Sequence, residues 1–387
     1  MAAPAVTIAG SLAQRPFRGG HAWVFLQYLL GFRRLGWDVL FVDRLEPGMC
    51  VDEAGAPAEF RRSANVRYLA KVMDRSGLGD RWSIRYAGGR EVAGLGDAEV
   101  LAHLSRSAFL LNVMGFLDDP QLLEAAPRRV FLDIDPGFGQ MWKDLGLSDV
   151  FAGHDDHVTI GENIGAPGCT IPTAGIEWIT TKQPVVLDEW PAVPPPAGGR
   201  FTSIGSWRGP FGPIEHGGRT YGLRVHEFRR FVELPSRSGA GFEVALDIDD
   251  ADAADLRSLT EHGWSIADPL VVAADPWGYR DYIRCSAAEL MVAKNLYVQS
   301  GSGWFSDRSI CYLASGRPVL AQDTGLDGLL PAGEGLLVFS TLAQAVAGVG
   351  EIVGDYRRHA AAARSIAEEH FASDRVLGRL LDRLGVA

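Results

Sequence analysis

The sequence predicts an α/β protein of two domains that face one another across a cleft. Two segments, 6–43 and 297–323, each place a loop and a helix between apolar strand patterns, which is the order of a βαβ unit. Between them, residues 184–199 are rich in proline, a composition typical of an extended linker. A chain of 387 residues is also long for one core. We therefore expect a first domain over 1–190, a linker over 191–199, a second domain over 200–370, and a terminal helix over 371–387 that packs back on the first domain.

The first domain is expected to begin with a strand, a loop, a helix and a second strand. Residues 6–9 form a short apolar strand, and residues 22–35 follow a helical period. Gly36 ends this helix, and residues 37–43 read as a buried strand. Three further strands are expected, each leading into a polar loop, at residues 110–114, 130–134 and 157–160.

The second domain restarts with a strand over 201–207 and continues with a helix, a strand and a helix over 225–232, 242–248 and 253–261. The segment 297–323 then predicts a strand, a glycine- and serine-rich loop, a helix capped by Ser306 or Asp307, and a last strand. Gly316 ends the helix, and Pro318 lies two residues beyond. A helix that starts from such a loop offers unpaired amides and a positive dipole end to an anion.

Composition excludes some classes of protein. Hydrophobic residues make up 47% and charged residues 22%, as in ordinary globular enzymes. The net charge of -11 argues against a general nucleic-acid binder but leaves room for a local basic pocket. Four scattered cysteines without a Cys-x-x-Cys pair suit neither a zinc site nor a disulfide framework, so we expect reduced thiols and a cytoplasmic protein. No signal peptide and no transmembrane segment are expected.

The segment 297–323 resembles the donor-binding half of the GT-B glycosyltransferases, where a small-residue loop, a helix and a Gly-x-Pro-Val strand hold the diphosphate of a nucleotide sugar. The counterpart here is Ala-Ser-Gly-Arg-Pro-Val at 314–319. Residues 333–338 resemble the family's Gly-x-Gly-Leu-Leu-Val strand, and 342–371 its closing helices. The likeness implies two Rossmann-like domains and sugar transfer from a nucleotide sugar to a small-molecule or glycan acceptor, with neither cofactor nor metal.

One departure from the family concerns stereochemistry. Retaining members usually carry paired glutamates in this block, and these align with Gly303 and Cys311. The histidine signature of the plant secondary-product transferases is also missing. The absent glutamates favour an inverting reaction.

The resemblance implies a set of donor-binding residues. Arg208 and Lys294 are expected to neutralise the diphosphate, although Lys294 also reads as a solvated helix end. Amides of the loop 302–306 would cradle the phosphates, and Gln322 with Asp323 would bind sugar hydroxyls. The whole expected set is Gly20, Ser206, Arg208, Lys294, Ser302, Gly303, Trp304, Ser306, Asp307, Gln322, Asp323, Thr324 and Gly325.

His21 is the candidate general base, because it follows Gly19-Gly20 where the first helix begins. In inverting relatives a histidine in this region deprotonates the acceptor hydroxyl, often oriented by an aspartate. Asp118 or Asp119 is the expected partner here. A helix-capping or surface role for His21 is the alternative.

Acidic residues after two other strands are further candidates. Asp133 and Asp135 could act as a base, bind a cation or hold acceptor hydroxyls, and a simple turn before Pro136 is equally compatible. Glu162 and Asn163 are expected on the acceptor side by the same logic. The run His-Asp-Asp-His at 154–157 does not predict a metal site, because neighbours in a strand point to opposite faces.

Three other functions fit parts of the sequence. A nucleotide-sugar epimerase would use the same fold without a separate acceptor pocket. A non-catalytic sugar- or nucleotide-binding protein would close around its ligand, although His21 and the cleft carboxylates argue against it. A nicotinamide dehydrogenase is the weakest, because the first strand is followed by GSLAQRPFRGG rather than Gly-x-Gly-x-x-Gly.

Overall fold

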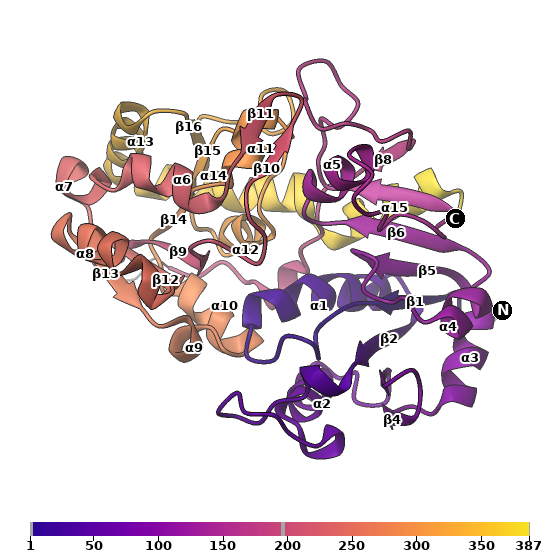
Figure 1. Cartoon of the computed structure of the whole chain (residues 1–387). Helices are drawn as coiled ribbons and strands as arrows, with labels where there is room; N and C mark the ends of the chain where they lie inside the picture. The colour runs from indigo at the N-terminus through magenta and orange to yellow at the C-terminus, as the bar shows by residue number, and fades with distance from the viewer. Residues whose placement is uncertain (1–2, 195–197, 387) are drawn as a thin grey trace.

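A computed structural model describes residues 3–194 and 198–386. It has two α/β halves, each with a largely parallel sheet flanked by helices (Figure 1). Over the described residues, one sheet has eight strands in the order β4-β3-β2-β1-β5-β6-β7-β8, and the other has six in the order β13-β12-β9-β14-β15-β16. The predicted fold class is therefore confirmed. In both sheets the first strand in sequence lies inside the sheet, and the strand order reverses beside it.

The first sheet is parallel except for the β3–β4 pair. It includes the predicted strands, with ends that differ by a few residues. The sequence analysis missed β3, β4 and β8, which lie toward the edges of the sheet and are short or partly polar. The strands are β1 (Ala5–Ala9), β2 (Asp38–Leu45), β3 (Trp82–Tyr86), β4 (Glu91–Gly94), β5 (Ser107–Val113), β6 (Arg129–Asp133), β7 (Asp156–Thr159) and β8 (Trp178–Thr180). Its helices are α1 (Gly19–Arg34), α2 (Ala64–Arg75), α3 (Asp97–Arg106), α4 (Pro120–Ala125) and α5 (Phe138–Asp144).

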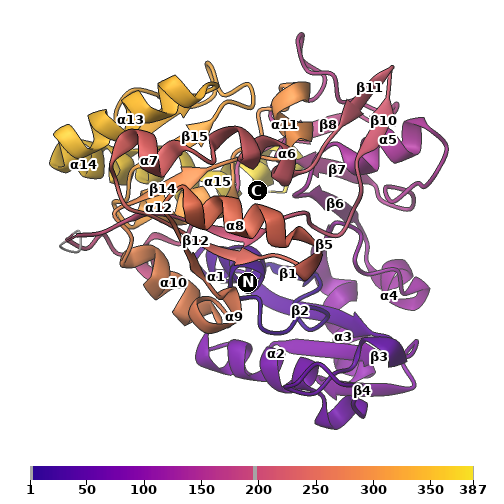
Figure 2. The same ribbon diagram turned by 60° about the vertical axis from the view of Figure 1, so that its left-hand side comes forward.

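The second half contains a parallel sheet and a separate hairpin, β10–β11, which reaches toward α5 of the first half (Figure 2). Its strands are β9 (Phe201–Ser206), β10 (Ile214–His216), β11 (Arg219–Tyr221), β12 (Phe242–Asp247), β13 (Trp264–Ala267), β14 (Ala288–Met291), β15 (Val319–Gln322) and β16 (Leu336–Phe339). Its helices are α6 (Arg224–Phe228), α7 (Leu234–Ser238), α8 (Ala253–Glu261), α9 (Pro269–Val272), α10 (Pro276–Arg284), α11 (Asn295–Ser300), α12 (Asp307–Ala314), α13 (Leu342–Gly354) and α14 (Tyr356–Ile366).

The strand predicted to begin at Tyr297 was wrong. Tyr297 lies in α11, which ends at Gly301 in the left-handed conformation (φ +59°). The strand that opens this unit is β14, which pairs in parallel with β15. All four residues of β14 are buried, and a run of four is too short to show the alternation of apolar and polar residues that identifies a strand. The helix that follows is correctly placed: Ser306 caps α12 by accepting a hydrogen bond from the Arg308 amide.

The end of the chain lies against the first half. Helix α15 (Ser373–Leu384) packs on α1, where Leu377 meets Gly31. The Ser373 amide donates to the Val185 carbonyl over 2.9 Å, and Arg128 donates to the Leu384 carbonyl. The domain boundaries remain predictions, and residues 195–197 of the expected linker fall outside the described part.

Over the described residues, no helix combines the length and apolar character needed to cross a membrane.

Candidate functional site

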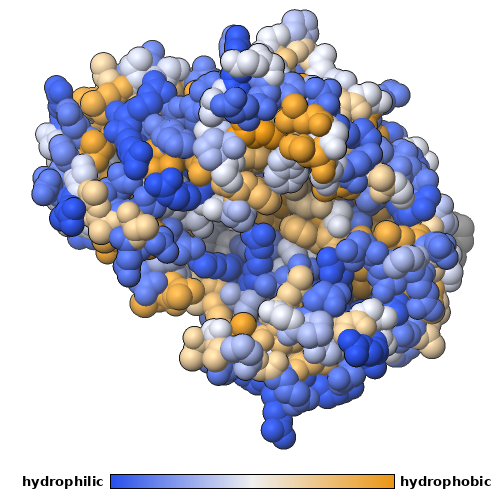
Figure 3. Space-filling model, in the orientation of Figure 1, coloured by the Kyte–Doolittle hydropathy of each residue, from blue (hydrophilic) through white to orange (hydrophobic). Residues whose placement is uncertain are grey.

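A cavity of about 630 Å³ lies between the two halves, where Figure 3 shows the surface hollowed. The loop after β1 and the start of α1 form one wall, and the loop after β9 forms another. Both β1 and β9 stand where the strand order of their sheet reverses, and ligands of open α/β sheets bind at such points. The lining residues include Arg15, Phe17, Arg18, Gly20, His21, Gly205, Ser206, Trp207, Arg208, Asp247, Asp252, Tyr279, Asp307 and Arg308.

The two glycines before His21 allow the halves to approach closely. Gly19 donates its amide to the Ala273 carbonyl over 2.9 Å, and a Cβ there would lie 2.2 Å from the Asp275 carbonyl oxygen. A Cβ on Gly20 would lie 2.8 Å from the Tyr279 ring. Real Cβ atoms do not approach this closely, so any larger residue would push α1 away from the second half.

The surroundings of His21 define its tautomer. Its Nε2 lies 3.1 Å from the Ser11 carbonyl oxygen and 3.0 Å from the Ser11 hydroxyl. Because a carbonyl oxygen only accepts, Nε2 carries the hydrogen and Nδ1 keeps its lone pair. Burial, together with Arg15 and Arg18, lowers the pKa of His21 to about 4. The imidazole is thus neutral at physiological pH and able to accept a proton at Nδ1.

The expected pairing of His21 with Asp118 or Asp119 is not observed. Asp118 is 66% exposed and lies 2.8 Å from the Arg44 guanidinium, and Asp119 caps α4 through the Leu122 amide. The Asn112 side chain causes this arrangement, because it donates to the Leu117 carbonyl and accepts from the Leu117 amide and so closes the turn after β5. The Ser11 backbone, rather than an aspartate, orients His21.

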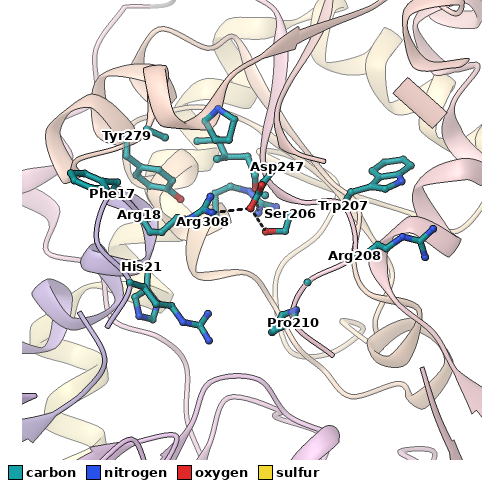
Figure 4. Close-up of a pocket in the computed structure, with 18 of the residues that line it drawn as sticks. Phe17, Arg18, His21, Ser206, Trp207, Arg208, Pro210, Asp247, Tyr279 and Arg308 are labelled. Carbon is teal, nitrogen blue, oxygen red and sulfur yellow. Dashed lines mark hydrogen bonds and ion pairs between the residues drawn. The ribbon is translucent and has the colours of Figure 1, made fainter. Parts of the chain in front are cut away.

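Arg208 and Lys294, the predicted phosphate ligands, are both engaged in ion pairs. Arg208 makes a two-pronged pair with Asp252 at 2.6 and 2.7 Å, and its guanidinium points away from His21 (Figure 4). Lys294 lies 2.6 Å from Asp135, which also accepts from the Tyr297 hydroxyl. Asp252 and Asp135 therefore already balance the charges of the two predicted ligands.

Two other arginines form no direct ion pair with a carboxylate in the described part of the chain. Over the described residues, neither Arg15 nor Arg224 has a carboxylate within ion-pair distance. Arg15 lines the cavity. Arg224 lies against Gly205, also a lining residue, and burial together with Arg308 lowers the pKa of its guanidinium to about 9. An anion in the cavity would offset the desolvation cost of the Arg224 guanidinium, and Arg15 presents an exposed guanidinium to the same cavity.

Two other cations at the cavity are paired. Arg18 reaches across the cavity to Asp247 at 3.0 Å, and Ser206 donates to the same carboxylate over 3.4 Å (Figure 4). Arg308 is buried, with Glu289 at 2.5 Å and the Ile204 carbonyl at 2.8 Å. Asp307, beside Arg308 at the start of α12, has its pKa raised by burial. Arg18, paired with a half-exposed aspartate, is the more easily released of the two arginines.

The glycine-serine loop is closed on itself rather than open as a phosphate cradle. The Gly303 amide donates to the Thr324 carbonyl over 2.7 Å, and the Trp304 amide donates to the Ser302 hydroxyl over 3.2 Å. The Trp304 ring stacks on Tyr297 at 4.3 Å between centroids. Within this segment, only Asp307 and Arg308 line the cavity.

The polar residues after β15 also serve the fold. Gln322 is fully buried, accepts from the Ala293 amide and donates to Glu227. Asp323 accepts from the Gly325 and Leu326 amides and so forms a turn. Thr324 donates to the Trp304 carbonyl over 2.6 Å. None of these side chains lines the cavity.

The expected acceptor residues likewise make internal contacts. Buried Asp133 accepts from Gln140 and Thr159, and burial raises its pKa to about 6. Glu162 pairs with Lys182 at 2.5 Å. Asn163 donates to the carbonyls of Gly301 and Gly325, which joins the two halves. In the parts of the chain that the structure describes, no group of three or more His, Cys, Asp or Glu side chains could hold a metal ion.

The facing parallel sheets and the cavity at their strand reversals define the GT-B fold. Solved structures of three glycosyltransferases share it over the whole chain. HepE from Anabaena, in complex with UDP-glucose, is 10% identical with a TM-score of 0.59 and covers 99% of this chain and 100% of its own. An α-glucosyltransferase bound to UDP and DNA is 11% identical, with a TM-score of 0.59 and coverage of 99% and 100%. Sucrose-phosphate synthase from Thermosynechococcus elongatus is 10% identical, with a TM-score of 0.52 and coverage of 99% of both chains. Neither a family model nor a curated protein matches the sequence.

The sequence analysis missed several residues at the cavity, and a signal for two of them was present. Arg15 and Arg18 stand in the run Arg-Pro-Phe-Arg-Gly-Gly at the end of the loop after the first strand, where a helix begins. A basic loop before a helix start is a recognisable anion-binding pattern. Asp247 and Tyr279, which line the cavity, and Arg224, which lies behind Gly205, carried no such signal, because their places depend on packing between distant segments.

Proposed function

We propose that this protein is a glycosyltransferase that moves a sugar from a nucleotide sugar to a small-molecule or glycan acceptor. The observation that supports this most strongly concerns two arginines that form no ion pair among the described residues. Arg15 lines the cavity formed by the loops after β1 and β9, and the Arg224 guanidinium lies against Gly205 in its wall. Cations there suit a diphosphate, because guanidinium groups bind phosphate oxygens with charge-assisted hydrogen bonds. The fold is shared with glycosyltransferases solved with UDP and UDP-glucose.

In the proposed reaction, Arg15 and Arg224 hold the diphosphate and stabilise its charge as the bond to the sugar breaks. Arg18 assists once the diphosphate displaces Asp247 from it. His21 removes the proton of the acceptor hydroxyl at Nδ1. These groups supply leaving-group stabilisation and base catalysis, so the reaction is proposed to be metal-independent.

Inversion at the anomeric carbon is part of the proposal. At the two positions where retaining relatives carry glutamates, Gly303 has no side chain, and the Cys311 thiol is buried with a pKa raised well above its usual value. A buried neutral thiol is a poor nucleophile. A direct attack by the acceptor from the His21 side therefore fits the site better than a covalent intermediate.

A cytoplasmic location is also proposed. It is supported by Cys50, Cys169, Cys285 and Cys311, all of which are free thiols.

The experiment that tests the proposed function is a thermal-shift screen of UDP, TDP, GDP, ADP and CDP, each with its sugar conjugates and free nucleoside. A ligand at one hundred times its dissociation constant adds ~2.7 kcal/mol to the free energy of unfolding. We expect the diphosphate and the sugar conjugates of one nucleoside to raise the melting temperature of the protein well above its value with that nucleoside alone. No response to any diphosphate or sugar conjugate at millimolar concentration would refute the proposal.

A further inference from the structure

We propose that Asp43 is a positioning residue that holds the loop after β1 in the form that presents Arg15, Arg18 and His21 to the cavity. The inference rests on the proposed function for the roles of these three residues, but its structural part stands on the contacts of Asp43 alone. Asp43 lies at the end of β2 and does not line the cavity.

The Asp43 carboxylate is completely buried and faces donors only. It accepts from the Ala13 amide over 2.6 Å, from the Gln14 side chain over 2.9 Å and from the Arg44 amide over 2.7 Å. Three N–H groups that converge on two oxygens match an ionised carboxylate. An amide or a protonated acid would turn a donor toward one of these N–H groups and lose a contact.

The same residue, Ala13, is also held through its carbonyl group. Asn65, also fully buried, donates to the Ala13 carbonyl over 2.8 Å and to the Met49 carbonyl over 3.1 Å. The amide of Ala13 is thus bound by Asp43 and its carbonyl by Asn65. Both side chains come from outside the loop, one from the end of β2 and the other from α2. The middle of the loop is fixed from both sides.

This fixed point determines where the functional groups lie. Ser11, whose carbonyl orients His21, is two residues before Ala13, and Arg15 is two residues after it. Without Asp43 the loop would lose its Ala13 and Gln14 contacts, whereas α1 would keep its own packing through Trp23 and Phe25. The expected defect is a displaced Arg15 and a freed imidazole on an otherwise folded protein.

The test compares Asp43→Asn with Asp133→Asn by amide hydrogen exchange of the full chain. Asp133 is the matched control, because it is also a buried carboxylate that accepts from side chains and an amide, but it lies outside this loop. In Asp43→Asn, exchange over residues 11–20 is expected to accelerate about tenfold or more, as for a lost hydrogen bond to a charged group. In Asp133→Asn, exchange there is expected to stay unchanged. Equal protection in wild type and Asp43→Asn would overturn the proposal.

A milder variant covers the case in which Asp43→Asn fails to fold. Gln14→Ala removes one donor from a partly buried loop position and is expected to raise exchange in residues 11–20 alone. It is also expected to weaken nucleoside diphosphate binding more than nucleoside binding, because Arg15 is the next residue. Unchanged exchange in Gln14→Ala would count against the proposal. Failure of wild type to bind any nucleoside diphosphate would refute the proposed function and leave the exchange comparison valid.

Discussion

At the scale of single residues, the bond from His21 Nε2 to the Ser11 carbonyl leaves Nδ1 free to take a proton. Replacement of His21 by Ala is therefore expected to lower kcat by about 10²–10⁴-fold while donor affinity stays nearly intact. Steady-state kinetics with saturating donor measure the change. Normal turnover would exclude His21 as the base, and a collapsed fold would show that its role is structural.

The pH dependence of the same group follows from its neighbours. Burial and two arginines hold the pKa of His21 near 4, so protonation of His21 in the free enzyme should reduce kcat/KM only below about pH 4. A bound diphosphate offsets the charge of Arg15 and Arg18, which favours the imidazolium and moves the acidic limb of kcat to higher pH. The two pH profiles, compared in wild type, check this. A kcat limb at or below that of kcat/KM would contradict it.

Titration of Asp43 is expected to make the affinity for the donor depend on pH, separately from the effect of His21. Burial raises the pKa of the Asp43 carboxyl group to about 7, although the three hydrogen bonds and the charge of Arg44 act to lower it. As pH falls through 7, the carboxylate takes up a proton and no longer accepts from all three donors, so nucleoside diphosphate affinity should fall. Calorimetric titrations between pH 5.5 and 8.5 measure this, and the loss should be absent in Asp43→Asn. A pH-independent wild-type affinity would contradict the expectation.

Arg15 and Arg208 differ in their ion pairing, and their replacement should therefore have different effects. Arg15→Ala is expected to weaken nucleoside diphosphate binding about tenfold or more with little effect on the nucleoside, because it removes a charge-assisted phosphate contact. Arg208→Ala should cost less, because Arg208 is already paired with Asp252. Isothermal titration calorimetry of the nucleoside diphosphate and of the nucleoside with each variant measures the two effects. A larger loss of diphosphate affinity in Arg208→Ala than in Arg15→Ala would indicate that Arg208, as the sequence predicted, is the main phosphate ligand.

At the scale of elements, the end of β9 sets the position of Arg224. A Cβ on Gly205 would lie 2.0 Å from the Arg224 Nη1, so Gly205→Ala must displace the guanidinium. We expect a selective loss of diphosphate affinity with an unchanged melting temperature within a few degrees. Gly212→Ala in the loop that follows β9 is the control, because no heavy atom lies within 4 Å of its added Cβ. Equal affinities in the two variants would show that Arg224 does not hold the diphosphate.

The elements also show what the sequence could predict. Helix α12, with its Ser306 cap and Gly316 stop, followed from capping residues that act locally. Strand β14 and helix α11 did not, because four buried residues show no period and α11 is stabilised by the stack of Tyr297 on Trp304. The polar residues Ser302, Gln322 and Asn163 were expected to bind ligands, yet their hydrogen-bond partners are other residues of the chain. A sequence pattern reveals a polar group but not which atom satisfies it.

At the scale of the whole molecule, the cavity exists only because two halves meet. The pairs that join them connect residues far apart in sequence, such as Arg18 with Asp247 and Asp135 with Lys294. No local pattern could show that Lys294 and Asp135 neutralise each other, or that Arg15 has no ion-pair partner among residues 3–194 and 198–386. The α/β class and the opening unit of each half were predictable from the sequence, whereas the charge balance at the cavity required the structure.

The most direct test of the central claim is to incubate the wild-type protein with its preferred nucleotide sugar and no acceptor, and to follow the products by NMR. A glycosyltransferase should slowly release the nucleoside diphosphate and free sugar, with water as acceptor, and an inverting one should release the sugar first as the opposite anomer. Loss of His21 should slow this release. Recovery of an epimerised nucleotide sugar, or of donor that stays bound and intact with every acceptor tried, would contradict the account.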